Sequence, residues 1–335
     1  MELEIKKAIV HVLDQGASAP VFSDRLLELG DDEADYIASH LEKAYYNDAG
    51  KSCTFLPDSD FPPLLLENDD FVKASKQIAE RIFGAMVEYP AIPSADLFVI
   101  LCQMEGHECV AVLKMNYKAA FAHYYQQVEG CHYNALIKQR TILPPASSKP
   151  DESFIVDMTN GSIRLVEKKY DMDGVKGFYL SEKILKSTQA QPERARLQAV
   201  QAAAVEAVRQ DYDESKQKEC EVTTILAEEA VAGGGNLQVE KLRSRLEEEF
   251  PLAVETFDRE LENTGISVQE QVQVSPARIK KMEYQSVKTE SGIELKIPTN
   301  LLTGENDYIQ FINEPDGTIN MCKNTHFDTI LFEWN

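Results

Sequence analysis

The sequence predicts an α+β protein with an antiparallel sheet and covering helices, a helical middle region and a small β-rich C-terminal part. Three observations predict this class: two hairpin patterns before residue 171, a block rich in Ala and Glu with helical spacing, and short alternating segments near the end. We therefore expect an α+β N-terminal domain over 1–190, an acidic helical region over 191–263 and a β-rich C-terminal region over 264–335.

The N-terminal part is predicted to begin with strands, followed by helices. Apolar residues are dense over 4–13, which indicates a half-buried strand, and 21–29 is expected to return as a second strand. Asp31 and Asp32 supply capping residues for an amphipathic helix. A second amphipathic helix is expected over 69–88, where prolines end it.

Residues 96–118 predict a hairpin in the centre of a sheet. Its apolar residues lie on both faces, which is typical of strands that are covered above and below. Cys102 and Cys109 are expected to face each other across this hairpin. A cross-strand disulfide therefore stays open, beside the expectation of free buried thiols in a reducing compartment. Residues 135–143 indicate one further strand.

A second hairpin is predicted over 154–170. Asn160-Gly161 is a strong signal for a two-residue hairpin turn. If these two residues form the loop, Asp157 faces Arg164, so the hairpin has one apolar face and one face with an exposed salt bridge.

The middle and end of the chain predict helices first and then strands. A long helix is expected over 192–232 with a break near 211–219, and Asn236 is expected to cap the next helix, over 237–249. The remaining elements are a helix opened by Pro251, a short basic helix after Ser275, and hairpins over 282–297 and 308–321.

The charge of the chain excludes a basic protein that coats nucleic acid with its whole surface. There are 56 acidic and 34 basic residues, and the formal net charge is −22. Such a chain repels a polyanion unless folding gathers its cations on one face. No apolar run approaches the roughly 20 residues of a membrane span, and the N-terminus does not resemble a signal peptide. We expect a cytoplasmic protein with no membrane partner.

Catalytic motifs are absent from the sequence. It has no phosphate-binding loop, dinucleotide fingerprint, nucleophile elbow or zinc-protease motif, and His123, Cys131 and His132 lack the spacing of a metal site. We expect no catalytic residue, no cofactor, no metal site and no enzymatic activity. One alternative is a metal-dependent nuclease that uses Asp157, Glu167 and Lys169. The predicted register disfavours it, because Glu167 and Lys169 point away from the face of Asp157.

Two local clusters of basic residues are candidates for contact with DNA phosphates. If folding brings them to one face, they neutralise several phosphates without reading bases. Few aromatic residues lie among them, so base stacking has little support. The candidate residues are Arg164, Lys168, Lys169 and Lys176 in the first cluster, and Arg278, Lys280, Lys281 and Lys288 in the second.

Segments at both ends of the chain resemble a known family. Residues 5–14 (IKKAIVHVLD) and 288–298 (KTESGIELKIP), with Phe311-Ile312-Asn313 and 315–319 (PDGTI), are similar to the bacterial 37-kDa nucleoid-associated protein family. The resemblance implies a cytoplasmic protein found with the bacterial nucleoid, DNA association and no established catalytic residue. It supplies no DNA site, so the basic clusters remain an electrostatic inference.

The leading hypothesis is a non-enzymatic nucleoid-associated protein that contacts DNA weakly and independently of sequence through the two clusters. The alternative is an adaptor whose acidic helices, over 192–263, bind a basic nucleoid protein; this block carries an excess of carboxylates. The oligomeric state is left open by the sequence.

Overall fold

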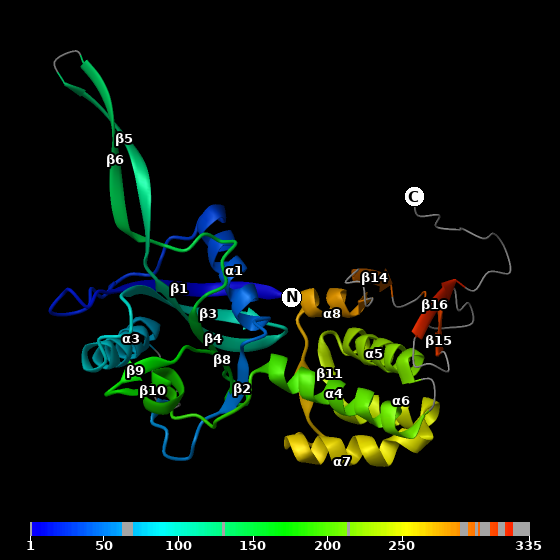
Figure 1. Cartoon of the computed structure of the whole chain (residues 1–335). Coiled ribbons are helices and arrows are strands. Elements are labelled where there is room, and N and C mark those ends of the chain that lie inside the picture. Colours follow the sequence, from blue (N-terminus) through cyan, green and yellow to red (C-terminus); the bar gives the residue numbers. More distant parts are fainter. Residues whose placement is uncertain are drawn as a thin grey trace. The chain divides into compact units, whose positions relative to one another are not determined.

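The computed structural model describes residues 2–61, 70–128, 131–212, 215–288, 294–298, 301, 309–313 and 319–323. The chain divides into two compact units, Met1–Pro192 and Glu193–Asn335, which we call unit 1 and unit 2 (Figure 1). The predicted α+β class is confirmed: an antiparallel six-stranded sheet stands beside helices. The predicted division into three parts stays a prediction.

The sheet of unit 1 has the strand order β1-β3-β4-β7-β8-β2, and every pairing is antiparallel. The hairpin predicted over 96–118 is confirmed and lies in the interior of this order. The bounds of the strands are β1 Leu3–Leu13, β2 Lys51–Thr54, β3 Ala95–Met104, β4 His107–Asn116, β7 Glu152–Asp157 and β8 Ser162–Val166.

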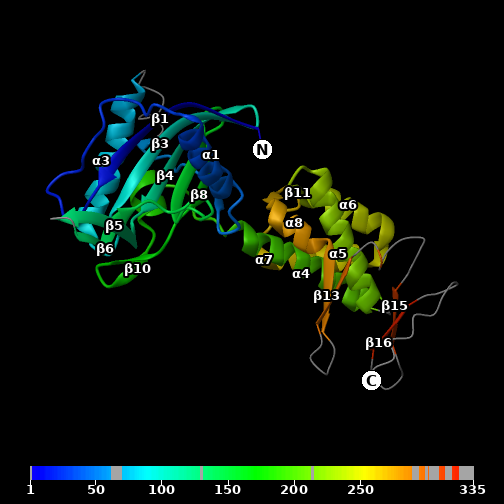
Figure 2. The same ribbon diagram turned by 90° about the horizontal axis from the view of Figure 1, so that it is seen from above.

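Helices cover both faces of the sheet, as its doubly apolar central strands require. One core joins the sheet to α3 (Phe71–Glu88) and to the short helix η1 (Leu180–Leu185). A second core joins the other face to α1 (Asp31–Tyr45). Figure 2 shows both helices beside the sheet. The two predicted helices are therefore confirmed, with Gly30 rather than Asp31 as the residue that caps α1.

The second strand predicted over 21–29 is wrong. Only Val21 bridges to Val12 of β1. Beyond it, the Ser23 hydroxyl donates to the Val10 carbonyl, and the Ser23 amide donates to Nδ1 of His11. These side-chain bonds take the place of a ladder, so the segment covers the edge of β1 without forming a strand.

The register predicted for the β7–β8 hairpin is also wrong. Ile155, not Asp157, faces Arg164. The carboxylate of Asp157 accepts hydrogen bonds from the Thr159 amide at 2.8 Å and the Asn160 side chain at 3.0 Å, which widens the loop beyond two residues. The shift is two residues, so the predicted apolar face is preserved, but the predicted Asp157–Arg164 salt bridge does not form.

Two further elements of unit 1 form a separate two-stranded ribbon, β5 (Lys118–Val128) and β6 (Cys131–Ile142). We call this ribbon the β5–β6 arm. Figure 1 shows the arm in green, extending away from the six-stranded sheet. The sequence predicted the second strand of the pair and missed the first.

Unit 2 begins with helices that pack side by side in both views (Figures 1 and 2). The predicted break in the long helix is confirmed, since α4 ends at Asp211 and α5 begins at Ser215. The helices share a core with α8 and a two-stranded sheet. The helices are α4 Glu193–Asp211, α5 Ser215–Ala232, α6 Val239–Glu249, η2 Pro251–Ala253, α7 Val254–Thr264 and α8 Pro276–Met282.

The prediction that Asn236 caps a helix is wrong. Asn236 belongs to a short strand and pairs with Gln273. Gly234 and Gly235 adopt positive φ angles of 63° and 94°, and the Gly235 amide donates to Ala230 at the end of α5. This sharp turn directs the chain into the strand before α6 can begin.

The remaining strands of unit 2 form three two-stranded pairings. The two C-terminal hairpins were predicted, and their strands are confirmed; their turns, at 290–292 and 315–317, lie outside the described residues. None of the described helices is both long and apolar enough to cross a membrane. The strands are β11 Asn236–Gln238, β12 Gln271–Gln273, β13 Tyr284–Lys288, β14 Glu294–Pro298, β15 Ile309–Asn313 and β16 Ile319–Lys323.

Candidate nucleic-acid interface

Arg164, the first candidate residue, uses its donors inside unit 1. Its guanidinium donates to the carbonyl oxygens of Tyr45 at 3.1 Å and Asn47 at 2.8 Å. Gly50 lies so close that a Cβ atom there would come within 2.8 Å of the guanidinium. Arg164 therefore fastens the end of α1 to β8, and we leave it out of the proposed interface.

The three lysines of the first cluster lie at the surface of unit 1. Lys168 is exposed and forms an ion pair with Asp151 at 2.8 Å. Lys169 is exposed, with its ammonium nitrogen 5.0 Å from the centroid of the Phe178 ring. Lys176 is exposed on the short strand β10 (Val175–Gly177), which pairs with β9 (Tyr170–Met172). Exposed ion pairs such as that of Lys168 are weak, so all three ammonium groups remain open to a phosphate.

A buried polar cluster includes Tyr170, which lies in the segment that bears the three exposed lysines. Lys114 forms an ion pair with Glu152 at 2.9 Å, and Tyr170 donates to the same carboxylate at 2.9 Å. Burial lowers the pKa of Lys114, whereas the charge of Glu152 acts in the opposite direction. Burial and the charge of Glu152 raise the pKa of Tyr170. The cluster is a structural network, because its charged groups are bound to one another and not to solvent.

The residues of the nuclease hypothesis are not brought together. Asp157 lies at the closed end of the β7–β8 hairpin, where it pairs with His107 at 2.8 Å. Glu167 follows the opposite end of β8, and its side chain is 0% exposed in an ion pair with Lys51 at 2.9 Å. Among the residues that the structure describes, no three His, Cys, Asp or Glu side chains form a group that could bind a metal ion.

The second predicted cluster lies in unit 2. Ser275 caps α8, since its hydroxyl accepts the amide of Arg278 at 3.3 Å. Arg278 is half-buried, and Lys280 and Lys281 are exposed in the last turn of this helix. Lys288 lies opposite Glu294 in the strand register of β13 and β14, and its side chain lies outside the described residues.

The β5–β6 arm is a surface that the sequence reasoning missed. Residues 118–128 and 131–142 contain Lys118, Lys138 and Arg140 and no Asp or Glu. Phe121 is 67% exposed and Leu136 is 74% exposed. The signal available in the sequence was the local lack of carboxylates in a chain with 56 of them.

The strand register divides the described side chains of the arm between two faces. We call the first the ring face, where direct pairing places Phe121 opposite Lys138 and His123 opposite Leu136. On this face the ammonium nitrogen of Lys138 lies 6.0 Å from the Phe121 ring centroid. The ring face comprises Phe121, His123, Tyr125, Gln127, His132, Asn134, Leu136 and Lys138.

Polar contacts order the ring face along its length. His123 Nε2 lies 2.9 Å from Asn134 Oδ1, and the rings of Tyr125 and His132 stack at a centroid distance of 5.6 Å. The opposite face carries no charged residue among the described side chains between residues 120 and 139, and the same alternation places Lys118, at the start of β5, on it. This face comprises Lys118, Ala120, Ala122, Tyr124, Gln126, Tyr133, Ala135, Ile137 and Gln139.

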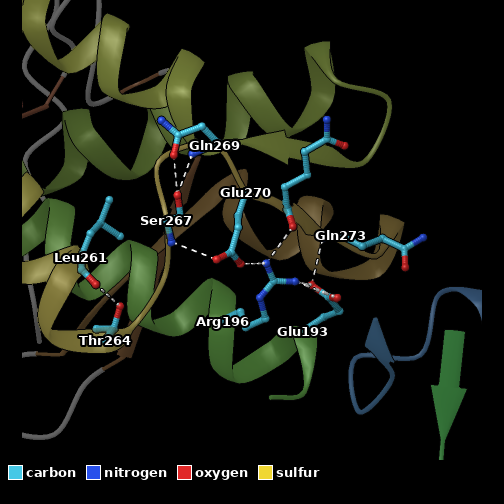
Figure 3. A network of polar contacts seen from close by, with 9 residues as sticks. Glu193, Arg196, Leu261, Thr264, Ser267, Gln269, Glu270 and Gln273 are labelled. Atoms are coloured by element: carbon cyan, nitrogen blue, oxygen red, sulfur yellow. Dashed lines mark hydrogen bonds and ion pairs between the residues drawn. The ribbon is translucent and has the colours of Figure 1, made fainter. Parts of the chain in front are cut away.

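Several arginines of the helical part of unit 2 form ion pairs with neighbouring carboxylates. Figure 3 shows Arg196 between Glu193 at 3.1 Å and Glu270 at 2.6 Å. Arg243 binds Asp258 at 2.8 Å, and Arg245 binds Glu249 at 2.8 Å. Because these cations are paired within the unit, the excess charge of the helical block is carried by carboxylates.

Comparison with known proteins identifies the family. The sequence pattern of the family described as nucleoid-associated protein YejK matches residues 9–327. No curated protein matches the sequence. The resemblance of the terminal segments is confirmed by this match, which spans nearly the whole chain and includes most of the six-stranded sheet, the helices of unit 2 and the described C-terminal hairpins. The chain therefore belongs to the family of nucleoid-associated protein YejK.

Proposed function

We propose that the chain associates with the nucleoid by contacting DNA phosphates directly, weakly and without reading the base sequence. The observation that carries this proposal is the exposure of the lysines in both clusters. Among the described residues, Lys169, Lys176, Lys280 and Lys281 have no carboxylate within ion-pair distance, and Lys168 has only the half-buried Asp151 as a partner. Ammonium groups that are not held by the protein are available to neutralise phosphates.

The remaining charge of the protein accounts for the expected weakness. The net charge of −22 repels DNA over most of the surface, so local contacts must act against a long-range repulsion. The affinity is then expected to fall steeply with salt. Each neutralised phosphate contributes about −0.9 to the slope of log affinity against log salt.

Fluorescence anisotropy with a labelled random-sequence duplex tests the proposal. Lys168→Glu/Lys169→Glu and Lys280→Glu/Lys281→Glu are each expected to weaken binding and to reduce the salt slope by about 2. Lys73→Glu/Lys241→Glu is the control, because it makes the same change in charge at exposed lysines outside both clusters. Equal losses in the control and the cluster variants would contradict local contact.

A second candidate function is binding of a basic nucleoid protein by the acidic helices of unit 2. It is favoured by the internal pairing of Arg196, Arg243 and Arg245, which leaves an outward excess of carboxylates. Glu248 and Glu255 are exposed on this block. If the adaptor hypothesis holds, Glu248→Lys/Glu255→Lys loses localisation to the nucleoid while its affinity for purified DNA does not fall.

A further inference from the structure

We infer that the β5–β6 arm binds double-stranded DNA by placing its ring face in the major groove. The inference rests on the proposed direct contact with DNA and adds a further binding element to it. It concerns a part of the chain outside both predicted lysine clusters.

The charge of the arm makes it a segment that a polyanion can approach with little repulsion. Within 118–142 there are three basic residues and a single acidic one, Glu129, which lies outside the described residues. The chain as a whole has the opposite balance, with a net charge of −22. A local positive segment on an anionic body orients the protein so that this segment meets the DNA first.

The shape of the arm fits the groove. The strands β5 and β6 contain 11 and 12 residues and pair with no other strand of the described part of the chain. At about 3.3 Å per residue the ribbon is about 35 Å long, close to one helical turn of DNA. The major groove, about 12 Å wide, admits a two-stranded β-ribbon, whereas the minor groove is about half as wide.

The side chains of the ring face supply the contacts that a groove offers. Lys138, with Arg140 two residues later on the same strand, provides cations for the phosphates at the groove edge. Phe121 and Leu136 expose most of their apolar surface and can pack against the walls of the groove without hydrogen-bonding to a base edge, so this contact is compatible with binding that is independent of sequence. Asn134 and His123 hold each other at 2.9 Å and present amide and imidazole groups toward solvent on the same face.

The difference in charge between the two faces of the arm indicates which face meets the DNA. Between residues 120 and 139 the described side chains of the opposite face include Tyr124, Tyr133 and Ile137 and no charged group, so along this part of the ribbon it offers a phosphate only neutral hydrogen-bond donors. The ring face carries Lys138 above the Phe121 ring, an arrangement that keeps the ammonium group at the surface. Charge complementarity therefore favours DNA on the ring face over a protein partner, which remains an outcome that the test can reveal.

The test compares full-length variants by anisotropy and by methylation footprinting on the same duplex. Dimethyl sulfate modifies guanine N7 in the major groove and adenine N3 in the minor groove. The wild type is expected to protect guanine N7. Lys138→Glu/Arg140→Glu is expected to weaken binding about tenfold at low salt and to lose that protection. Phe121→Ser/Leu136→Ser is expected to lose protection with a smaller change in the salt slope.

Controls separate this inference from the proposed function. Lys73→Glu/Lys241→Glu provides the matched change in charge, and circular dichroism with thermal unfolding checks that the exposed arm substitutions leave the fold intact. If the wild type binds duplex DNA and the arm variants bind equally well, the arm inference is overturned and the proposed function stands. Protection of adenine N3 alone overturns the assignment to the major groove. A wild type that does not bind duplex DNA overturns both.

Discussion

Lys114 and Glu152 form an ion pair between neighbouring central strands, with a distance of 2.9 Å and side chains that are 2% and 0% exposed. Tyr170 donates to the same carboxylate, and Lys114 also donates to Asn116 at 2.6 Å. The folded protein needs both partners of a charge pair at this depth, because either charge alone would be buried without an opposite charge to compensate it. The pair joins the sheet to the segment that bears the exposed lysines of unit 1.

Lys114→Met is expected to lower the free energy of unfolding by about 3–5 kcal/mol, because it leaves the Glu152 carboxylate buried and uncompensated. Adding Glu152→Gln in the same chain is expected to recover part of this loss, since the amide is neutral. Urea unfolding of the two variants measures the difference. A free energy of unfolding for Lys114→Met within about 1 kcal/mol of the wild type would show that the pair is not coupled to the fold.

The buried ring of His11 is expected to make the folded protein less stable in acid. Its Nδ1 accepts the Ser23 amide at 3.2 Å, so the ring is neutral in the folded state, and Nε2 donates to the Ser75 hydroxyl at 3.0 Å. Burial lowers the pKa of His11 to about 4, from 6.5. The unfolded chain therefore takes up the proton first, and stability from this group is present above pH 6.5 and is lost as the pH falls toward 4.

The size of the His11 effect is at most about 3 kcal/mol. Chemical unfolding across this pH range, for the wild type and His11→Gln, isolates it from the carboxylates, which titrate in both proteins. The wild type is expected to have the steeper dependence. Parallel profiles for the two proteins would contradict a neutral buried His11.

Arg164→Lys is expected to destabilise unit 1 by about 2 kcal/mol, because a lysine cannot reach both backbone carbonyls that the guanidinium binds. Gly50→Ala is expected to destabilise it as well, through contact with the Arg164 side chain. At temperatures where both variants are folded, DNA affinity is expected to match the wild type. A loss of affinity at unchanged stability would return Arg164 to the interface.

The stability of unit 2 is expected to depend on the ion pair between Arg196 and the buried Glu193. The Glu193 side chain is 2% exposed and is bound by Arg196 (Figure 3). Arg196→Met is expected to cost about 3 kcal/mol by leaving that carboxylate without its cation. Arg194→Met, at an exposed position on the same helix, is the matched control and is expected to change stability by less than about 0.5 kcal/mol. Comparable losses in both variants would contradict the role of the network.

Much of the fold follows from local signals in the sequence. The apolar pattern of β3 and β4 predicted their interior position, and Asp70 caps α3 through the amides of Val72 and Lys73. The register of β7 and β8 could not be predicted, because the Asp157 carboxylate competes with the backbone for the turn. A signal from Asn160-Gly161 alone does not reveal that competition.

The candidate site was less predictable than the fold. A basic residue in the sequence does not reveal whether its charge is used internally, as it is for Arg164, or is left at the surface, as it is for Lys169. The arm was missed because aromatic and aliphatic residues in a strand pattern indicate a buried face, whereas Phe121 and Leu136 are exposed. The sequence does not distinguish a strand with a buried face from one with an exposed face. The strand register and the pairing of β5 with β6 alone, among the described strands, show that these side chains are exposed.

The central claim is direct contact with DNA, and the salt dependence of wild-type binding tests it most directly. Anisotropy of a random-sequence duplex between about 50 and 200 mM salt is expected to give an affinity that falls linearly on logarithmic axes, with equal values for unrelated sequences. Absence of binding at the lowest salt, or binding that does not change with salt, would contradict phosphate contact by this chain.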